Sequence, residues 1–261
     1  MICRSSQQGQ RLDVAGLNQI LVLVDRSETR LTEVGLNTWR KGLEGPPHSH
    51  EAKEQIFYVT AGSGVVVVGR ARYPVKPGSL VYVPPRVVHQ TIVTGEEPLT
   101  YLLFNAFLDA SKEGHASFAE HIEQVKLLRK QQAETQKADV AGASASLSSD
   151  HPGKHVPEAD GGPRSGSGAL LLDRSETCRS EVARLVCLAG GHVEAVTDPV
   201  AERTLYVLKG GGQLALGDET AELHPGDVAF IPWHTPHRLI ATQSDLVCLC
   251  FSTRVADAVA V

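Results

Sequence analysis

Polar and apolar residues alternate over short runs in this chain, and glycine or proline interrupts nearly every run. After a first apolar segment at 20–24, such runs occupy residues 55–60, 65–68, 72–75, 80–83, 89–93 and 99–104. Runs of this length and period predict β-strands. Many short strands separated by Gly/Pro turns are typical of a β-sandwich or β-barrel. The pattern therefore predicts an all-β fold.

The second half of the chain repeats the first. The pentapeptide DRSET at 25–29 recurs at 173–177, a spacing of 148 residues, and Pro77-Gly78 and His89 recur at the same spacing as Pro225-Gly226 and His237. Constant spacing over about 65 residues indicates an internal duplication. The second copy has its own predicted strands at 204–208, 213–216, 221–223, 228–231, 238–241 and 246–251.

The segment between the copies differs from both. Residues 115–137 contain no Gly or Pro, and Phe118, Ile122, Val125 and Leu128 recur at helical spacing. This pattern predicts an amphipathic helix at about 114–137. Residues 138–167 are rich in Ala, Ser, Gly, Pro and Asp, which predicts a flexible linker. We therefore expect a first domain at 1–113, a helix and linker at 114–167, and a second domain at 168–261.

Composition narrows the classes of function. The formal charge of −5 and the pI near 6.1 give no electrostatic reason to expect a nucleic-acid partner. The chain contains no run of 18 apolar residues, so no membrane span is predicted. The five cysteines are odd in number and lack CxxC spacing, which favours free thiols and a reducing, cytoplasmic location.

The strongest candidate for chemistry is a group of histidines in the first copy. His48 and His50 are two residues apart, so on an extended strand both side chains point to the same face. Neighbouring strands can bring Gln55 and His89 to the same point. Imidazole is a common ligand of first-row divalent metals. The pattern therefore predicts a metal site inside the first β-module.

The same residues resemble a known family. Two segments carry the resemblance: Gly45-x2-His48-x-His50-x4-Gln55-x6-Gly62, and Pro77-Gly78-x5-Pro84-x4-His89. They look like the two motifs of the cupin superfamily, and because both copies are covered, the chain resembles a bicupin. The resemblance implies two jelly-roll (double-stranded β-helix) barrels. It also implies one divalent metal in the first barrel, with His48, His50, Gln55 and His89 as ligands.

The fourth ligand departs from the commoner family pattern, which has Glu where this chain has Gln55. Glu54 is adjacent but has the opposite strand parity, so Gln55 is favoured and Glu54 is the alternative. Three imidazoles and an amide would leave the full charge on the metal, which favours Lewis-acid chemistry. This ligand set is similar to that of the cupins that linearise unsaturated uronates. The metal can be Mn, Fe, Ni, Zn or Co.

The second copy has lost most of these residues. At the spacing of 148, His48, His50 and Gln55 correspond to Val196, Asp198 and Arg203. Only His237 persists, and a fixed cation at Arg203 would repel a metal. We therefore expect no metal in the second barrel and a structural role in pairing with the first. An anion site formed by Arg203 and His237 is a weaker alternative.

Other residues are candidates for substrate contacts. Asn105 shares a strand face with Tyr101 and Leu103, so it can line the cavity, and it is the candidate catalytic residue. Arg40, Arg72 and Arg86 could hold a substrate carboxylate, although surface positions are the commoner place for arginine. Trp39 and Trp233 are expected to be packing residues.

These inferences favour a metal-dependent enzyme that isomerises or opens the ring of a small sugar-acid or other carbonyl metabolite, without redox chemistry. A non-haem iron dioxygenase and a non-catalytic ligand-binding bicupin are the alternatives. The expected partners are a small-molecule substrate and, inside the chain, the other barrel. A homodimer is compatible with the sequence, whereas nucleic acid and membrane partners are not expected.

Overall fold

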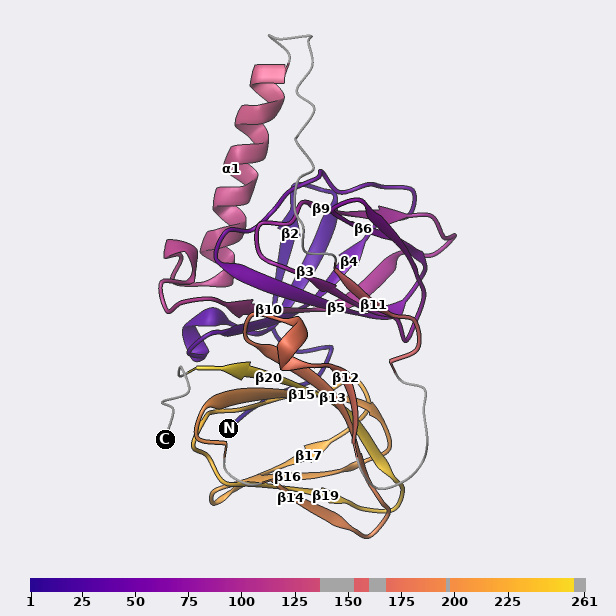
Figure 1. The fold of residues 1–261 in the computed structure, drawn as a ribbon, viewed down its shortest axis with the longest axis vertical. Helices are drawn as coiled ribbons and strands as arrows, with labels where there is room; N and C mark the ends of the chain where they lie inside the picture. Colours follow the sequence, from indigo (N-terminus) through magenta and orange to yellow (C-terminus); the bar gives the residue numbers. More distant parts are fainter. Residues whose placement is uncertain (137–152, 160–167, 196–197, 256–261) are drawn as a thin grey trace.

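Two β-barrels stacked on each other form the molecule, and a helix projects from the first barrel (Figure 1). The computed structural model describes residues 1–136, 153–159, 168–195 and 198–255. Within these residues the all-β prediction is confirmed. The one α-helix among them lies between the two barrels in the order of the chain. No helix in these residues is long and apolar enough to cross a membrane. All five cysteines are described, and each is a free thiol.

The first barrel consists of a seven-stranded and a three-stranded sheet. The larger sheet has the order β11-β8-β5-β10-β4-β3-β2 and the smaller has the order β7-β6-β9. Their strands are β2 (Gln10–Val14), β3 (Asn18–Val24), β4 (Thr32–Trp39), β5 (Lys53–Ala61), β6 (Gly64–Val68), β7 (Ala71–Val75), β8 (Leu80–Val83), β9 (His89–Val93), β10 (Leu99–Phe107) and β11 (Lys154–Val156). The strands predicted from alternation are all present. The unpredicted β4 runs alongside β3, and its Gly35 is where the two strands approach closely.

The second barrel repeats this plan. Its sheets have the orders β1-β18-β15-β20-β13-β12 and β14-β19-β16-β17. Their strands are β1 (Ile2–Arg4), β12 (Ala169–Leu172), β13 (Ser180–Cys187), β14 (His192–Ala195), β15 (Ala201–Lys209), β16 (Gly212–Leu216), β17 (Glu219–Leu223), β18 (Val228–Ile231), β19 (His237–Ala241) and β20 (Leu246–Arg254).

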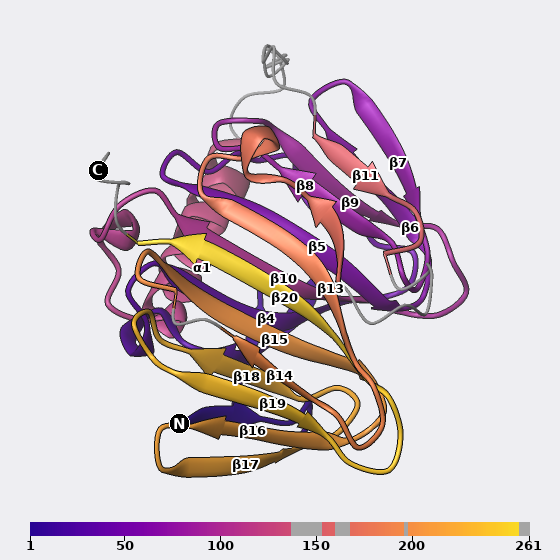
Figure 2. The ribbon, with the colours of Figure 1, turned by 60° about the horizontal axis from the view of Figure 1, so that its bottom comes forward.

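The two barrels exchange a strand. β1, at the start of the chain, pairs with β18 of the second barrel, whereas β11 pairs with β8 of the first barrel. Figure 2 shows β11 beside β8 and the N-terminus beside the strands of the second barrel. β8 and β18 would otherwise be sheet edges with unpaired backbone groups. The predicted linker at 138–167 is therefore partly strand, and the first strand of the predicted first domain belongs to the second barrel. The remainder of that linker, 138–152 and 160–167, lies outside the described residues.

The helix α1 (Phe118–Gln136) begins four residues later than predicted. The Ser117 hydroxyl accepts a hydrogen bond from the Glu120 backbone N–H, and the Glu120 carboxylate accepts one from Ala116. This reciprocal pair caps the helix at Ser117. The preceding residues form the 3-10 turn η2 (Lys112–Gly114) instead, in which Glu113 has a φ of 61°.

A shared core and two pseudo-symmetric contacts join the barrels. Phe104 stacks on Phe251 with ring centroids 4.9 Å apart, and Tyr58 lies 5.8 Å from its counterpart Tyr206. These two tyrosines are equivalent residues of the two copies. Glu202 of the second barrel accepts hydrogen bonds from the backbone of residues 30 and 31 in the first. The duplicated barrels thus pack through equivalent surfaces.

The repeated DRSET segments form equivalent turns, η1 (Arg26–Glu28) and η3 (Arg174–Glu176). In each turn the aspartate side chain accepts a hydrogen bond from the serine N–H, and the glutamate carboxylate accepts one from the aspartate N–H. The arginines differ between the copies. Arg26 is fully buried and pairs with the buried Glu33 at 2.5 Å, whereas Arg174 and its partner Glu181 are partly exposed at 3.2 Å.

Candidate metal centre

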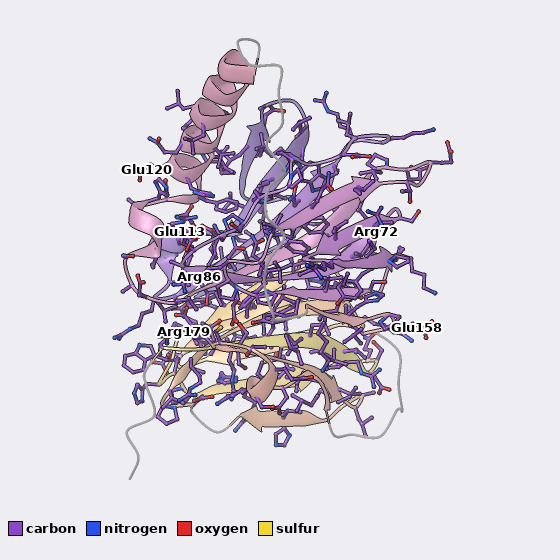
Figure 3. All side chains as sticks on the ribbon, turned by 45° about the horizontal axis from the view of Figure 1, so that its top comes forward. Arg72, Arg86, Glu113, Glu120, Glu158 and Arg179 are labelled. Carbon is purple, nitrogen blue, oxygen red and sulfur yellow. The ribbon has the colours of Figure 1, made fainter. Side chains whose placement is uncertain are left out.

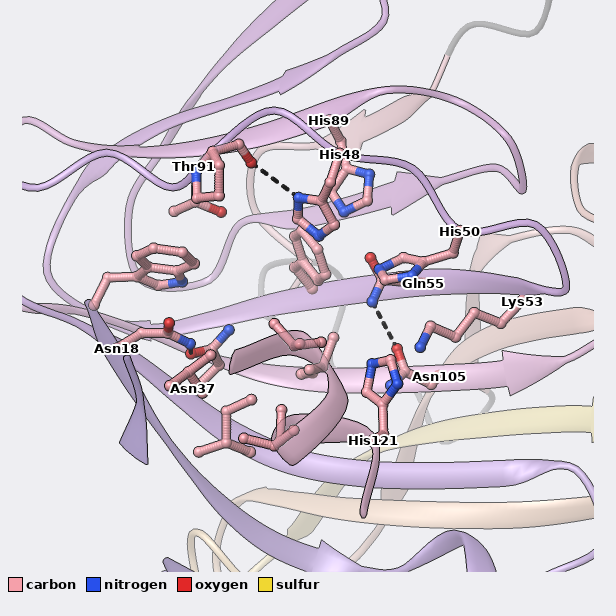
Figure 4. Close-up of a pocket in the computed structure, with 18 of the residues that line it drawn as sticks. Asn18, Asn37, His48, His50, Lys53, Gln55, His89, Thr91, Asn105 and His121 are labelled. Carbon is pink, nitrogen blue, oxygen red and sulfur yellow. Dashed lines mark hydrogen bonds between the residues drawn. The ribbon is translucent and has the colours of Figure 1, made fainter. Parts of the chain in front are cut away.

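Three histidines from two adjacent segments converge inside the first barrel (Figure 4). His48 and His89 face each other in an isolated antiparallel bridge, with backbone hydrogen bonds of 3.1 and 2.8 Å. The His50 carbonyl accepts a hydrogen bond from the Arg86 N–H at 2.7 Å, which fixes the segment after His48. One ring nitrogen from each of the three histidines lies within 4.8 Å of the others. The structure therefore brings together the histidines that the sequence predicted.

Backbone carbonyls set the tautomers of two of these histidines. Nδ1 of His48 lies 3.0 Å from the Pro46 carbonyl, and Nδ1 of His89 lies 3.2 Å from the Val87 carbonyl. A carbonyl can only accept a hydrogen bond, so each Nδ1 carries the proton and Nε2 keeps its lone pair. Burial, reinforced by the nearby His48, lowers the pKa of His89 to about 3. His89 therefore presents a neutral imidazole at neutral pH, the form that binds a metal.

The Gln55 side chain has a buried oxygen that faces no partner. Asn105 Nδ2 donates to the Glu33 carboxylate at 2.6 Å, so Asn105 Oδ1 is left to accept from Gln55 Nε2 at 2.9 Å (Figure 4). Gln55 Oε1 is then a buried acceptor without a hydrogen bond among the described residues. An unpaired buried carbonyl oxygen is costly unless a ligand satisfies it. The donor set thus fits a divalent metal held by three imidazoles and one amide oxygen.

Asn105 lines the cavity as predicted, but its amide is occupied on both sides. It accepts from Gln55 and donates to Glu33, which in turn pairs with Arg26. An amide also does not ionise near neutral pH, so it is a poor general acid or base. This geometry makes Asn105 a positioning residue for Gln55, and the catalytic role predicted for Asn105 has no support in it.

Glu54, the alternative fourth ligand, points to the opposite face of β5. Its carboxylate accepts hydrogen bonds from the Tyr82 hydroxyl at 2.8 Å and from the backbone N–H groups of Cys178 and Arg179 at 2.8 and 3.0 Å. Cys178 and Arg179 belong to the second barrel, so Glu54 joins the barrels. Glu54 and Glu202 are equivalent residues in this pseudo-symmetric interface.

A pair of neighbouring substitutions separates the two roles. We expect Gln55→Ala to weaken metal binding by about tenfold or more, because a ligand is lost. Glu54→Ala should leave the metal content unchanged and lower the free energy of unfolding by about 3 kcal/mol, because three donors lose a charged acceptor. Metal analysis and urea unfolding of both variants check this. Metal loss in Glu54→Ala alone would contradict the assignment.

The histidines open into a cavity of about 310 Å³. One part of its wall is apolar and includes Phe118, Ile122 and Val125 of α1, so the helix covers the cavity. Opposite, the Tyr101 hydroxyl accepts hydrogen bonds from Trp39 Nε1 at 2.8 Å and Asn37 Nδ2 at 3.1 Å. Burial raises the pKa of Tyr101 to about 12, so its hydroxyl stays protonated. The cavity volume suits a small metabolite.

Two cavity residues were missed from the sequence, Lys53 and His121. Lys53 is two residues before Gln55 on β5, so strand parity alone places it on the metal face. His121 lies three residues after Phe118 and one before Ile122, so it falls within the apolar stripe of the helix. Burial lowers the pKa of His121 to about 2. Strand parity could have identified Lys53, whereas identifying His121 also requires the position of α1 over the cavity.

The predicted carboxylate-binding arginines do not reach the cavity. Arg40, Arg72 and Arg86 are all exposed, and Arg86, which is 75% exposed, pairs with Glu51 at 3.3 Å. Arg72 and Arg86 lie at separate positions on the first barrel (Figure 3). All three occupy the surface positions that are the commoner place for arginine, and none lines the cavity. Trp39 is buried against the cavity and Gly45, consistent with packing.

In the second barrel an ion pair stands where the first barrel has His50 and Gln55. Asp198 is the equivalent of His50, and Arg203 is the equivalent of Gln55. Their charged groups are 3.1 Å apart, and Arg174 lies 3.8 Å from Asp198. His237 repeats the tautomer of His89, with Nδ1 3.1 Å from the Thr235 carbonyl. Val196, the equivalent of His48, lies outside the described residues. Asp198 neutralises Arg203, which weakens the case for an anion site there.

Comparison with sequences places these motifs in a wider group. The family model described as "Cupin domain" matches residues 36–105 and 184–252, together more than half of the chain. A glucose-6-phosphate isomerase of Thermococcus onnurineus (strain NA1) is 36% identical over 64 residues, which is 23% of this chain and 34% of that relative. An uncharacterized protein of Methanocaldococcus jannaschii is 33% identical over 55 residues, 21% of this chain and 44% of the relative. The chain thus spans less than half of these relatives.

Solved structures share the fold of the whole chain. Protein Ylba from E. coli superposes with a TM-score of 0.69 at 13% identity, covering 98% of this chain and 91% of that one. An oxalate decarboxylase of Lactobacillus farciminis, in a formate complex, has a TM-score of 0.65 at 14% identity and covers 98% and 87%. An oxalate decarboxylase of Bacillus subtilis with Mn(II) centres has a TM-score of 0.67 at 15% identity and covers 99% and 78%. At these identities the likeness shows the two-barrel fold.

Proposed function

This chain belongs to the cupin family, and we propose that it is a metal-dependent enzyme with a single reaction centre at the histidine cluster of the first barrel. The observation that carries the proposal is the donor set: three imidazoles within 4.8 Å and the unpaired Gln55 oxygen, at the wall of a cavity in the first barrel. His48, His50, His89 and Gln55 would hold the metal. Manganese, as in the Bacillus subtilis oxalate decarboxylase, is one candidate, beside Fe, Ni, Zn and Co.

The proposed reaction is a non-redox isomerisation or ring opening of a small carbonyl or carboxylate metabolite. A divalent metal at the cluster would supply Lewis acidity to a substrate carbonyl or hydroxyl. The four donors are neutral, so the centre attracts an anionic or electron-rich oxygen. The 36% identity to a glucose-6-phosphate isomerase over part of the chain supports an isomerase more than an oxidative reaction.

Residues of the protein line the cavity and fix the positions of its polar groups. Helix α1 covers one side of the cavity with Phe118, Ile122 and Val125, which gives the substrate an apolar wall. The Tyr101 hydroxyl is held by Trp39, Asn37 and Thr91, so it is fixed as one polar end of the cavity. Glu33 and Asn105 keep the Gln55 oxygen directed away from β10 and towards the histidines.

Metal removal tests the proposal. Protein stripped with a chelator is expected to lose turnover, and restoring one divalent metal should recover it. The substrates to be tested are an unsaturated uronate, followed by its loss of absorbance, and glucose-6-phosphate, followed by formation of the ketose. An oxygen electrode runs in parallel. Turnover that survives complete metal removal would contradict the proposal, and stoichiometric oxygen consumption would replace it with a dioxygenase.

A further inference from the structure

A lysine is buried inside the cavity, next to the proposed metal centre. Lys53 begins β5, and its side chain is 1% exposed. It lines the same cavity as His50, Gln55 and Asn105. A buried ammonium group is expensive unless partners satisfy its charge and its hydrogen-bond donors. The partners of Lys53 therefore indicate what the cavity is built to hold.

Two carboxylates of the described residues lie near this ammonium group, but only one accepts a hydrogen bond from it: the buried Glu33 interacts with its charge, and Glu113 bonds to it directly. Glu113 accepts a hydrogen bond from Lys53 Nζ at 2.8 Å, and the same carboxylate lies 3.9 Å from Nδ1 of His50. An ammonium group has three N–H donors. Among the described residues, Glu113 is the hydrogen-bond acceptor recorded for Lys53. The remaining donors are thus available to a ligand in the cavity.

A second unsatisfied group lies in the same corner. His121 of α1 lines the cavity, and its buried Nδ1 has no hydrogen-bond partner among the described residues. Its ring centroid is 6.4 Å from that of His50. Figure 4 shows Lys53 and His121 on the side of the pocket that carries Asn105, opposite Asn18 and Asn37. The corner therefore offers an ammonium and an imidazole beside the histidine cluster.

We propose that Lys53 and His121 form a carboxylate subsite, which makes the substrate a small carboxylic acid whose reacting oxygen lies within a few bonds of its carboxylate. That the bound carboxylate is the substrate rests on the proposed function, whereas carboxylate binding at Lys53 and His121 does not depend on it. The Lys53 ammonium can donate to one oxygen of a carboxylate, and His121 can donate to the other in the tautomer whose Nδ1 carries the proton. The 6.4 Å between His121 and His50 sets the short reach from this subsite to the cluster. Glu113 sets the position of the Lys53 ammonium and competes with the ligand for it.

Pyruvate is the probe, and pyruvamide is its uncharged counterpart. Ligand-detected NMR titrations on metal-depleted, full-length protein should show saturable pyruvate binding. Lys53→Met should weaken that binding by about tenfold or more, because a charged hydrogen bond is lost. Pyruvamide should bind the wild type correspondingly more weakly than pyruvate does. Lys41→Met, which removes an exposed lysine outside the cavity, should match the wild type.

A variant with the opposite expected effect keeps the test independent of folding. Glu113→Gln removes the carboxylate that competes with pyruvate for the Lys53 ammonium. The affinity for pyruvate should therefore rise several-fold. The subsite is overturned by any of four results. These are no saturable pyruvate binding to the wild type, unchanged binding in Lys53→Met, unchanged or weaker binding in Glu113→Gln, or inorganic phosphate displacing pyruvate with the higher affinity.

Comparison of metal-depleted with zinc-loaded protein separates this inference from the proposed function. If the cluster binds no metal while pyruvate binding still depends on Lys53, the carboxylate subsite stands and the metal-dependent function fails. If the cluster binds zinc while pyruvate binding ignores Lys53, the function stands and the subsite fails.

Discussion

Replacing His89 by alanine is expected to abolish stoichiometric metal binding and all metal-dependent turnover. His89 is 3% exposed, its Nδ1 faces the Val87 carbonyl, and its other nitrogen meets those of His48 and His50. Loss of an outer partner of a metal ligand already costs about 10–100-fold in affinity, so loss of the ligand itself should exceed about 100-fold. Metal content after dialysis, measured by mass spectrometry, is the direct readout.

The second barrel supplies the matched control. His237 occupies the equivalent strand position, with the same carbonyl contact to its Nδ1, but its neighbours there are Arg203 and Asp198. His237→Ala should therefore leave metal content at the wild-type value. Equal metal loss in both variants, or retention of metal in His89→Ala, would show that the cluster of the first barrel is not the metal centre.

Replacing Arg26 by methionine is expected to lower the free energy of unfolding by about 3–5 kcal/mol, because it leaves a buried carboxylate without its cation. Arg26 and Glu33 are both fully buried and 2.5 Å apart. Arg26 also donates a hydrogen bond to the Lys112 carbonyl, so its loss frees the η2 turn that carries Glu113. Urea unfolding followed by circular dichroism measures the change.

Arg174→Met is the control for this variant, since the duplication places Arg174 in the equivalent turn. Its pair with Glu181 is partly exposed and longer, at 3.2 Å, so its loss should cost about 0–1 kcal/mol. Similar losses in the two variants would mean that the burial of the Arg26–Glu33 pair has no energetic consequence. Unchanged stability of Arg26→Met would also remove the reason to regard Glu33 as the anchor of Asn105 and Gln55.

Much of the fold and of the metal centre could be predicted from short sequence patterns and from the internal repeat. Alternation along an extended segment predicted that His48 and His50 share a face, and alternation along β5 separated Gln55 from Glu54. The constant spacing of the repeat identified two copies of one module. A Gly/Pro turn between strands then set the position of His89. Each of these inferences depends on residues close together in the chain or on an exact repeat.

The features that the sequence did not predict depend on contacts between segments far apart in the chain. The three residues of β1 pair with β18 more than 220 residues away, and nothing in their own sequence identifies that partner. Similarly, β11 lies within a segment whose composition indicates a linker. The position of α1 over the cavity decides that His121 faces the histidines, and helical periodicity alone does not state which barrel its apolar stripe covers.

The duplication explains why the second barrel persists without the donor set of the first. Glu54 and Glu202 each cap backbone N–H groups of the opposite barrel, and Phe104 and Phe251 share one core. Each barrel also supplies an edge strand to the other's sheet. The second barrel therefore stabilises the first, whose interior carries the buried polar groups of the centre.

Anomalous diffraction from crystals grown with one divalent metal locates the bound metal directly. We expect one strong peak per chain, within bonding distance of His48, His50, His89 and the Gln55 oxygen, and no peak between Arg203 and His237. A peak in the second barrel, or a first barrel that stays empty at saturating metal, would contradict this expectation.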